Sequence, residues 1–313
     1  MRRPCLFLLL GLIPLLLIHG QRFRVATWNI ENAFDTVHDE GKDDLEFTPT
    51  SKRHWHSGRY WRKLRGITQT LAAMELPALV GLQEVENDTV LRDLTRRTAL
   101  WTAQYQYVIT NSLDSRGIDV GLLYKPSLFS LLSWKAVRIP SIGHGLNPTR
   151  DILVACGIAG KDTLHICVVH LPSRRNNDHA TKRNRTLAVE TLCGILDSLQ
   201  GQKVIVMGDF NAEPGDKLFS RLSSYLCTLI STDKRGTNEK RGTYYFRGVW
   251  DYLDHILISP ELLSSSVGRA EECRFPWLLR TEKGIPHRTY GGTNYLGGIS
   301  DHLPLIADFS TMH

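Results

Sequence analysis

The sequence predicts a layered α/β sandwich built on mixed β-sheets, and two observations support this prediction. Short runs rich in β-branched residues recur along the whole chain, and segments with a helical spacing of apolar residues lie between them. Some neighbouring runs are joined by short turns, as in hairpins, whereas others are separated by a helical segment, as in β-α-β crossings. Both kinds of connection in one chain indicate mixed sheets covered by helices.

Nine strands are expected from the β-branched runs. They span residues 23–30, 78–83, 105–110, 119–124, 152–158, 164–170, 204–208, 252–258 and 303–309. Two longer segments, 38–62 and 274–298, are expected to lack regular structure. Long loops in a compact domain are commonly functional or disordered. Because these two are rich in aromatic and basic residues, a substrate-facing role is favoured over disorder.

Three helices are expected between these strands. Their apolar stripes are Leu64, Ile67, Leu71 and Met74, then Leu91 and Leu94, then Ala188, Leu192, Ile195, Leu196 and Leu199. Pro77 is expected to end the first helix, and Asp88 to cap the second.

The first twenty residues are interpreted as a secretory signal peptide. Arg2 and Arg3 form a basic segment, an apolar run follows from Leu6 to Ile18, and the small residue Gly20 comes next. An uncleaved membrane anchor is the lesser alternative, because thirteen apolar residues are too few to span a bilayer. The mature protein is therefore expected to start at Gln21 and to lie in the periplasm or outside the cell, without stable membrane insertion.

Residues 21–313 are expected to form one catalytic domain, because no linker, repeat or low-complexity tract divides them. Without Arg2 and Arg3, the 38 basic side chains become 36, against 32 acidic ones, a net charge of +4. A mild positive excess suits an anionic substrate but does not identify one.

Five cysteines remain after the predicted signal peptide, and their odd number and spacing exclude a zinc cluster or a disulfide scaffold. Cys156 and Cys167 flank an expected hairpin turn. They are expected either to form a disulfide across two strands or, with more weight, to stay buried free thiols.

Four separated fragments carry polar side chains at the expected ends of buried strands: TWNIEN (27–32), LQEVEN (82–87), GDFN (208–211) and SDH (300–302). Isolated polar groups at such places would cost several kcal/mol unless something pairs them. Their convergence would create an acidic pocket suited to a hard divalent cation. This pattern indicates hydrolysis of a phosphate ester.

These fragments, together with VVHLPSR (168–174), LDHI (253–256) and the extension to SDHLP, resemble the ordered motifs of the endonuclease/exonuclease/phosphatase superfamily. The resemblance runs from about Phe23 to Phe309. The extended first motif and the C-terminal PHRTYGGTNYLGGISDHLP resemble a secreted bacterial branch. The resemblance implies a four-layer sandwich, with two mixed β-sheets packed face to face and flanked by α-helices.

The resemblance also implies a metal site. Glu84 matches the main metal ligand of the family, with Asn29 and Asp301 beside it. Oxygen ligands of this kind suit Mg²⁺ or Mn²⁺. For Glu84 taken alone, the alternative is a purely structural role, in which a glutamate at the end of a strand caps the next helix.

The same resemblance implies five catalytic residues. Asp209 would orient or activate the attacking water, and Asn211 would hold a phosphate oxygen. His302 would lie against the scissile phosphate, oriented by Asp254, either as a base or as a cationic clamp. His170 resembles the histidine that assists the leaving group in the deoxyribonuclease and sphingomyelinase branches.

Four residues are expected to support or bind the substrate. Arg174 and Arg288 would bind phosphate through their guanidinium groups, and Asp119 would support His170. Tyr290 would stack on a base or sugar ring, although packing of the long loop onto the domain explains it equally well. Arg116 is a further candidate for a phosphate contact.

The leading interpretation is a secreted, divalent-metal-dependent phosphodiesterase, with nucleic acid as the expected substrate and in-line attack by water. A phospholipid phosphodiesterase or phosphomonoesterase with the same site is the first alternative. A membrane-acting enzyme should display an exposed apolar hairpin, for which residues 275–279 are the candidate. The second alternative is a non-catalytic secreted binding protein, which ranks low because every motif residue is present.

Overall fold

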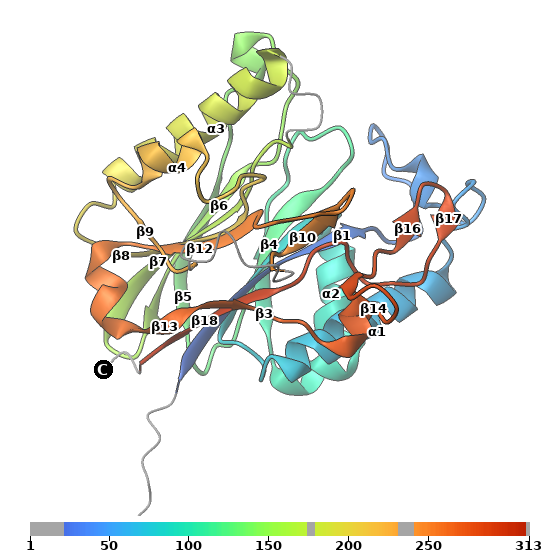
Figure 1. Cartoon of the computed structure of the whole chain (residues 1–313), viewed down its shortest axis with the longest axis horizontal. Coiled ribbons are helices and arrows are strands. Elements are labelled where there is room, and N and C mark those ends of the chain that lie inside the picture. Colours follow the sequence, from blue (N-terminus) through green and yellow to red (C-terminus); the bar gives the residue numbers. More distant parts are fainter. Residues whose placement is uncertain (1–21, 174–178, 231–240, 311–313) are drawn as a thin grey trace, which may run out of the picture.

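The computed structural model describes residues 22–173, 179–230 and 241–310. Within them, two six-stranded mixed sheets pack face to face, with helices on both outer faces (Figure 1). This arrangement confirms the four-layer sandwich.

The first sheet has the strand order β13-β18-β1-β2-β4-β3. Its strands are β1 (Phe23–Ala33), β2 (Leu79–Val85), β3 (Gln106–Ile109), β4 (Asp119–Tyr124), β13 (Ser266–Glu272) and β18 (Leu305–Phe309). β1 runs parallel to β2 and antiparallel to β18, so the two ends of the described chain are neighbours in this sheet.

The second sheet has the order β5-β6-β7-β8-β12-β9. Its strands are β5 (Ser130–Val137), β6 (Ile152–Ala159), β7 (Asp162–His170), β8 (Lys203–Asp209), β9 (Cys227–Thr228) and β12 (Asp254–Ile258). β7 and β8 are parallel, and the helix between them makes the crossing that parallel neighbours require.

The helices cover the outer faces of the two sheets. α1 (Ser57–Ala73) and α2 (Asp88–Arg96) pack on the first sheet, and α3 (His179–Asp197) and α4 (Lys217–Leu222) on the second. The five 3₁₀ turns among the described residues are η1 (Leu45–Phe47), η2 (Ala99–Ala103), η3 (Ile142–His144), η4 (Pro260–Ser265) and η5 (Pro276–Leu278). In the described part of the chain, no helix is long and apolar enough to cross a membrane.

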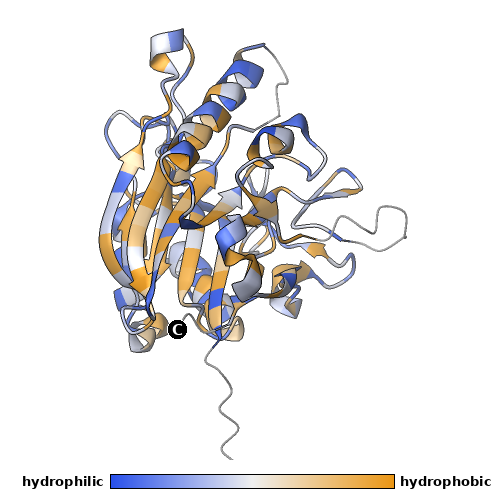
Figure 2. Ribbon diagram, turned by 90° about the vertical axis from the view of Figure 1, so that its left-hand side faces the viewer, coloured by the Kyte–Doolittle hydropathy of each residue, from blue (hydrophilic) through white to orange (hydrophobic). Residues whose placement is uncertain are grey.

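Three apolar clusters hold the four layers together. The central one joins the sheets through residues such as Val25, Leu122, Ile166 and Met207, and the other two lie under the two helical layers. Figure 2 shows the strands as largely hydrophobic segments. At Gly81, an added Cβ would lie 3.2 Å from Met207 and Val168, so the glycine lets the sheets approach closely.

All nine expected strands are present, and several expectations need correction. β5 and β13 were not predicted: they are edge strands with several exposed side chains, so the buried alternation that marks a strand is weak. α2 is capped by Asn87, whose Oδ1 accepts a hydrogen bond from the Val90 N–H at 3.3 Å; Asp88 is the first helical residue. The backbone of Asn87 is extended, as a capping residue requires.

The two long segments contain more structure than expected. α1 already begins at Ser57, because His56 caps it by accepting a hydrogen bond from the Gly58 N–H. The second segment holds two small hairpins, β14 (Leu279–Arg280) with β15 (Ile285–Pro286) and β16 (Tyr290–Gly291) with β17 (Asn294–Tyr295).

Aromatic side chains fasten these two segments onto the first sheet. Phe47 stacks on Phe34, and Trp55 and Tyr290 are buried with ring centroids 6.0 Å apart. Phe275 and Trp277, from the segment considered as an apolar hairpin, also pack against this core. These aromatics therefore contribute to packing of the domain.

The expected hairpin around Cys156 and Cys167 is β6–β7, but the two thiols are not opposite each other. Cys156 faces His165 and Cys167 faces Val154, and both are free cysteines. Both are therefore free thiols, as expected, but only Cys167 is buried, whereas Cys156 is half-buried.

Candidate active site

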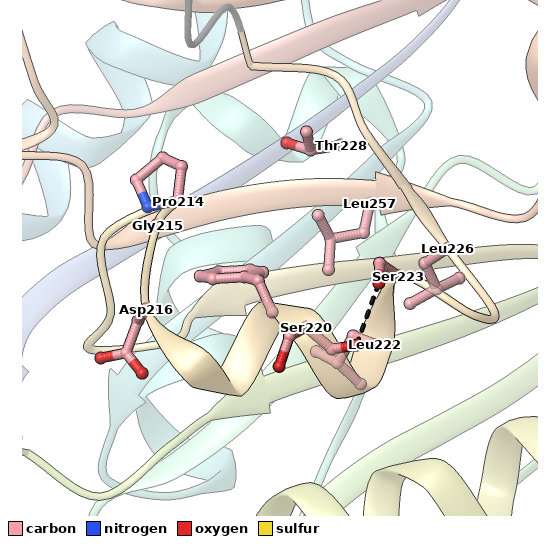
Figure 3. Close-up of a pocket in the computed structure, with 10 residues that line it drawn as sticks. Pro214, Gly215, Asp216, Ser220, Leu222, Ser223, Leu226, Thr228 and Leu257 are labelled. Atoms are coloured by element: carbon pink, nitrogen blue, oxygen red, sulfur yellow. Dashed lines mark hydrogen bonds between the residues drawn. The ribbon is translucent and has the colours of Figure 1, made fainter. Parts of the chain in front are cut away.

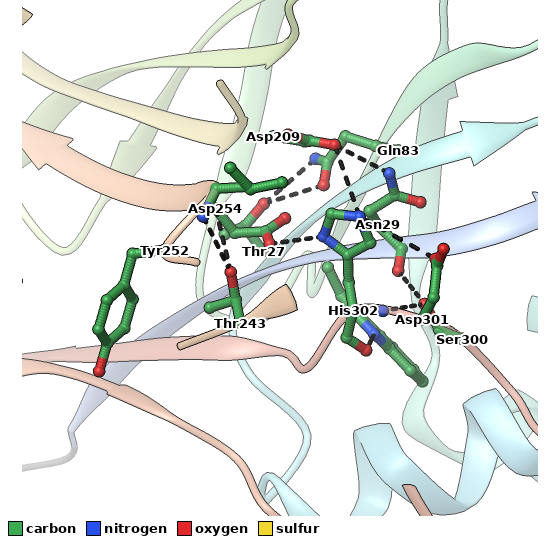
Figure 4. A network of polar contacts seen from close by, with 12 residues as sticks. Thr27, Asn29, Gln83, Asp209, Thr243, Tyr252, Asp254, Ser300, Asp301 and His302 are labelled. Carbon is green, nitrogen blue, oxygen red and sulfur yellow. Dashed lines mark hydrogen bonds and ion pairs between the residues drawn. The ribbon is translucent and has the colours of Figure 1, made fainter. Parts of the chain in front are cut away.

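A cavity of about 800 Å³ lies where β1, β2, β7 and β8 end and β12 begins. It is lined by Asn29, Glu31, Asn32, Glu84, Arg116, Arg150, His170, Ser173, Asp209, Asn211, Tyr244, Phe246, Arg247, Asp251, Leu253, Asp301 and His302. Seven of the eight residues expected in the metal and catalytic sets line it, and the eighth, Asp254, bonds to His302 behind the wall. Figure 4 shows Asn29, Asp209, Asp254 and His302 converging from both sheets.

Gly208 brings the two polar strand ends of the second sheet together. Its φ of +148° disfavours residues with a side chain, and an added Cβ would lie 1.9 Å from the Val169 carbonyl oxygen. β8 can therefore run close beside β7, in a register that pairs His170 with Asp209. The His170 Nε2 atom lies 3.5 Å from Asp209 Oδ2.

The first sheet contributes an amide and a carboxylate. Asn29, buried on β1, donates from Nδ2 to Glu84 Oε1 at 3.3 Å and to Asp209 Oδ2 at 3.0 Å, so it links the two sheets. Glu84 interrupts the end of β2 with a left-handed φ of +62°. Its Oε2 accepts the N–H of Asn32 at 2.8 Å, which fixes the carboxylate at the cavity wall.

The two buried carboxylates have opposite pKa shifts. Burial raises the pKa of Glu84, but the charge of Arg116 and the Asn32 N–H outweigh it, so the net pKa is lowered. Burial, with the Asp254 charge, raises the pKa of Asp209 to about 7 despite the attraction of His302. Glu84 is thus ionised at neutral pH, whereas Asp209 is poised to gain or lose a proton.

His302 forms a carboxylate–imidazole pair with Asp254, at 2.7 Å between Nδ1 and Oδ2. Burial opposes protonation of His302, but Asp254, Asp209 and Asp301 raise its pKa well above the ordinary value. Because Asp254 holds Nδ1, Nε2 is the nitrogen left for a ligand, and His302 lines the cavity as an imidazolium.

His170 is the opposite case. Burial and the charges of Arg150 and Arg116 lower its pKa well below the ordinary value, so this imidazole is neutral. Among the described residues, its buried Nδ1 has no hydrogen-bond partner. The cavity therefore holds one charged and one neutral imidazole.

The donor set fits a hard divalent cation. Glu84 is ionised, and Asp301 adds a second carboxyl group to the same cavity wall. Burial and the charge of Asp301 raise the pKa of Glu31, which also lines the wall, to about 8, so Glu31 is mainly protonated at neutral pH without a cation. Asp209, Asp254 and His302 form a second possible metal-ligating group, with one ligand atom each within 4.8 Å of one another. The pKa shifts favour the Glu84 side, because Asp209 is only partly ionised at neutral pH and His302 is protonated. Oxygen donors of this kind suit Mg²⁺ or Mn²⁺.

Arg150 and Arg116 give one side of the cavity a positive charge. Arg150 is buried, donates to the Leu171 carbonyl at 2.8 Å and pairs with Asp114 at 3.2 Å; it was not predicted from the sequence. Arg116, next to it in the cavity lining, also pairs with Asp114. Arg288 does not line the cavity but donates to Asp301 Oδ2 at 2.7 Å, so it steadies a wall residue.

The sequence analysis also missed the hairpin of β10 (Tyr244–Phe246) and β11 (Val249–Asp251), which forms one wall. Tyr244 forms a backbone bridge with His302, and their rings lie 4.7 Å apart. Alternating aromatics on both sides of an Arg-Gly turn are a hairpin signal that could have identified this element. Glu31, another missed wall residue, lies within the TWNIEN motif itself.

The other expected site residues lie in different surroundings. Asn211 lines the cavity, with its amide donating to the Leu171 carbonyl at 3.0 Å. Asp119 accepts hydrogen bonds from Thr110 Oγ1 and the Ser112 N–H, so it holds the loop after β3. Tyr290 donates its hydroxyl to the Arg53 carbonyl and does not line the cavity. Arg174 lies outside the described residues.

His255, the neighbour of Asp254, has a structural role, as its position on the opposite face of the strand predicts. Its buried ring packs against Phe210 and Phe219, and Nε2 contacts the Ala212 carbonyl at 2.8 Å. A separate pocket of about 350 Å³ beside α4, shown in Figure 3, contains none of the expected site residues. Asp216 in its lining caps α4 by accepting the Leu218 N–H.

Two curated relatives match most of the chain. Nocturnin from Xenopus laevis is 26% identical over 92% of this chain and 72% of its own length. Human Nocturnin is also 26% identical, over 92% of this chain and 65% of its own length. The chain thus spans about two thirds of these relatives.

Solved structures share the fold at low sequence identity. The human Nocturnin catalytic domain with bound sulfate anion has a TM-score of 0.58 and 22% identity, covering 92% of this chain and 93% of that one. D. rerio TDP2, complexed with a single strand DNA product, has a TM-score of 0.59 and 16% identity, covering 93% and 100%. A mannosyl-6-phosphatase from Bacteroides thetaiotaomicron has a TM-score of 0.61 and 17% identity, covering 92% and 99%.

The model of one protein family matches residues 24–310, nearly the whole described chain. The matched span contains every motif that lines the cavity. The chain therefore belongs to the endonuclease/exonuclease/phosphatase family.

Proposed function

We propose that the protein is a divalent-metal-dependent phosphodiesterase that hydrolyses nucleic acid by in-line attack of water. The observation that carries this proposal is the single cavity in which an ionised Glu84, a proton-poised Asp209 and a cationic His302 meet. A phosphodiester needs charge neutralisation, an oriented water and a group that supports the leaving oxygen. These three side chains and His170 supply the means for each.

The proposed reaction divides the work among four side chains. Asp209 orients the attacking water and takes its proton, since a carboxylate with a pKa of about 7 is an effective base at neutral pH. His302 presents its charged Nε2 to a phosphoryl oxygen. The new bond from the water oxygen to phosphorus forms while the bond to the leaving oxygen breaks. Neutral His170 donates a hydrogen bond to the leaving oxygen, which then takes a proton from solvent to become the alcohol.

Asn29, Glu84 and Asp301 would hold the divalent cation, with Glu31 as a neighbouring carboxyl group. A cation bound there supplies positive charge that neutralises the phosphate and the departing oxygen. Asn29 has a second task within the protein, because its amide couples the Glu84 and Asp209 carboxylates at fixed distances.

Two observations support a nucleic acid as the substrate. Arg116, Arg150 and Arg247 line the same cavity as the carboxylates, which suits a substrate with more than one phosphate. The D. rerio neighbour with this fold holds a single strand DNA product. Phosphomonoesters and phospholipids are the alternatives against which the assay must discriminate.

The proposal is tested by comparing single-stranded DNA, single-stranded RNA, sphingomyelin, a sugar phosphate and bis-p-nitrophenyl phosphate, each with Mg²⁺ or EDTA. Wild type, Glu84→Gln and the matched surface variant Glu261→Gln run side by side. We expect Mg²⁺-dependent cleavage of nucleic acid, lowered at least about a hundredfold by Glu84→Gln and unaffected by Glu261→Gln. Glu84-dependent turnover of the lipid or the sugar phosphate alone would move the function to that substrate, and no turnover at all would favour a binding protein.

We also propose that the protein is exported, with a bacterial periplasm or the extracellular space as its location. The support is the basic and apolar pattern of residues 1–20. Expression of the full chain in a bacterium, followed by fractionation and N-terminal sequencing, tests it. The expected product begins at Gln21 outside the cytoplasm; a full-length cytoplasmic or membrane-bound product would contradict export and cleavage.

A further inference from the structure

We propose that the β10–β11 hairpin is a stacking platform for the nucleobase next to the scissile phosphate. This inference rests on the proposed function and specifies its substrate: an unpaired nucleotide unit rather than a simple phosphate ester. None of the motifs that define the catalytic groups includes the hairpin, so its contribution is separate from theirs.

The hairpin is fixed to the catalytic centre at its base. Tyr244 bridges to the backbone of His302, and the Leu303 N–H donates to the Thr243 carbonyl at 2.7 Å. The Thr243 hydroxyl accepts from the N–H groups of Leu253 and Asp254, both at 3.2 Å. The same backbone that orients the Asp254–His302 pair therefore orients the hairpin.

One face of the hairpin presents a row of flat groups that leads outward from His302. The Tyr244 ring lies 4.7 Å from the His302 ring, and the Phe246 ring follows 6.4 Å further, 20° from parallel to it. The Arg247 guanidinium lies 5.1 Å from the Phe246 ring centroid. All four side chains line the cavity, so the row begins at the imidazolium and ends at the cavity mouth.

Phe246 keeps 46% of its surface exposed although it stands in this wall. Aromatic and guanidinium planes are the surfaces on which unpaired bases stack, so the exposed part of this ring can receive a base. The two strands pair tightly around a turn at Arg247 and Gly248, with φ values of +47° and +93°, so the row is presented by regular hairpin backbone. A base attached to a phosphate at His302 lies within reach of this row.

The chemistry favours a base over a lipid. A membrane-inserting hairpin would place its apolar side chains on the outer tip, whereas Tyr244 and Phe246 face the cavity and the tip itself carries Arg247. Val249 is the other exposed apolar residue at this end, 58% exposed and paired with Phe246. Two apolar side chains beside an arginine make a small surface for a bilayer.

The other face of the hairpin provides a matched control. Tyr245 and Trp250 lie opposite each other across the strands, with ring centroids 5.4 Å apart, and neither lines the cavity. Tyr245→Ala therefore removes an aromatic ring from the same hairpin without touching the proposed platform. Phe246→Tyr keeps the stacking ring, and Phe246→Leu keeps only the apolar bulk.

The test measures equilibrium binding by calorimetry in the presence of Mg²⁺. The ligands are the 5′-phosphonate of adenosine, in which carbon replaces the bridging oxygen, and the same ribose phosphonate without the base. Neither can be hydrolysed at the bridging position, so the outcome does not depend on turnover. We expect wild type to bind the adenosine ligand at least about tenfold more tightly than the baseless one.

The preference for the base should vanish in Phe246→Ala, fall in Phe246→Leu, and persist in Phe246→Tyr and Tyr245→Ala. Thermal unfolding of each variant confirms that the protein is folded. Equal binding of both ligands by wild type, or a preference retained by Phe246→Ala, would overturn the proposal. Phe246-dependent binding to sphingomyelin–phosphatidylcholine vesicles, without a base preference, would overturn it in favour of a membrane contact.

Failure of this inference and failure of the proposed function give different results. A Phe246-dependent base preference in a protein that cleaves no nucleic acid would support the platform and contradict the nuclease. Mg²⁺-dependent cleavage of nucleic acid without any base preference would support the nuclease and contradict the platform.

Discussion

The two sheets contribute different chemistry to one cavity. The first sheet supplies Glu84, whose buried carboxylate stays ionised because Arg116 and the Asn32 N–H stabilise its charge. The second supplies Asp209, whose side chain is 2% exposed against 15% for Glu84, and whose pKa rises to about 7 because burial and Asp254 outweigh its attraction to His302. The two carboxylates thus differ in charge because their exposure and their neighbours differ.

His302 connects the two halves. Its backbone precedes β18 of the first sheet, whereas its side chain is held by Asp254 at the start of β12 in the second. The fold therefore places the ionised carboxylate of Glu84, suited to a cation, in the first half of the cavity, and the proton-exchanging carboxyl group of Asp209 in the second half. The contrast predicts that substitutions in the two halves have different signatures, even where both lower the rate.

Asp254→Asn should have the largest effect, because it weakens the proton-handling half without touching Glu84. We expect kcat to fall by about 10² to 10⁴, with the affinity for metal retained. The loss of the carboxylate should lower the pKa of His302, so the alkaline limb of the pH–rate profile should move to lower pH. Kinetics from pH 5 to 10 check both, with Asp162→Asn, on the distant end of β7, as the control.

Arg116→Ala should affect the first half and make the two halves more alike. Without its charge the pKa of Glu84 should rise, and the pKa of His170, which Arg116 lowers, should rise as well. We expect about a tenfold to hundredfold loss in kcat/KM, with weaker Mg²⁺ binding at pH 6 than at pH 8. Arg221→Ala, which removes a half-exposed arginine paired with Glu190, is the matched control. A loss independent of pH would indicate a phosphate contact alone.

The pH dependence of kcat/KM in the wild type should report the titration of Asp209. Since the folded pKa of Asp209 is raised to about 7, kcat/KM should fall about tenfold per pH unit below that pKa. A bound cation favours the charged form, so Mg²⁺ should shift the acid limb to lower pH, but the limb should stay above the pKa of about 3.9 of a free aspartate. An acid limb at the free value would contradict the assignment of Asp209 as the base.

The smallest expected effect lies away from the cavity, where β1 meets β18. Arg24 donates to both carboxylate oxygens of Asp308, at 2.7 and 2.9 Å, and lowers the pKa of that carboxyl. A lowered pKa stabilises the fold above the unfolded value of about 3.9, and this stabilisation is lost as the pH falls through the folded value. Asp308→Asn should lower the free energy of unfolding by about 1–2 kcal/mol at pH 7 and have little effect near pH 2.

Urea unfolding at both pH values measures this difference, and activity assayed in parallel should match the wild type. A lower kcat in a fully folded Asp308→Asn protein would show that the far end of the first sheet influences the cavity. Such a result would contradict the separation of the cavity into two halves with different roles.

The sequence predicts the polar residues at the ends of the strands better than it predicts the residues that form the walls of the cavity. Asn29, Glu84, His170 and Asp209 were predictable because these polar side chains lie at the ends of short apolar runs, which form almost continuously buried strands. Arg150 was not, because it follows an irregular loop and gains its place only through contacts with Asp114 and the Leu171 carbonyl.

Tyr290 and the β10–β11 hairpin show the complementary difficulty. An aromatic residue in a long loop is consistent both with stacking on a substrate and with packing on the domain, and the burial of Tyr290 against Trp55 is a tertiary fact. Tyr244 and Phe246, in a short run with ordinary hairpin spacing, instead line the cavity. The local sequence pattern is compatible with a hairpin, but only the backbone bridge between Tyr244 and His302 shows that this hairpin lies at the site.

The division between the two halves is tested most directly by titrating Mn²⁺ into wild type, Glu84→Gln and Asp209→Asn, with electron paramagnetic resonance to count free ions. The two variants make the same change, carboxylate to amide, in two residues that line the same cavity. We predict that Glu84→Gln lowers the affinity for Mn²⁺ at least about tenfold. Asp209→Asn should bind Mn²⁺ with an affinity within about threefold of wild type, although its kcat should fall steeply. Equal loss of Mn²⁺ binding in both variants would show that the cation spans the two halves, and would contradict the separation of charge from proton transfer.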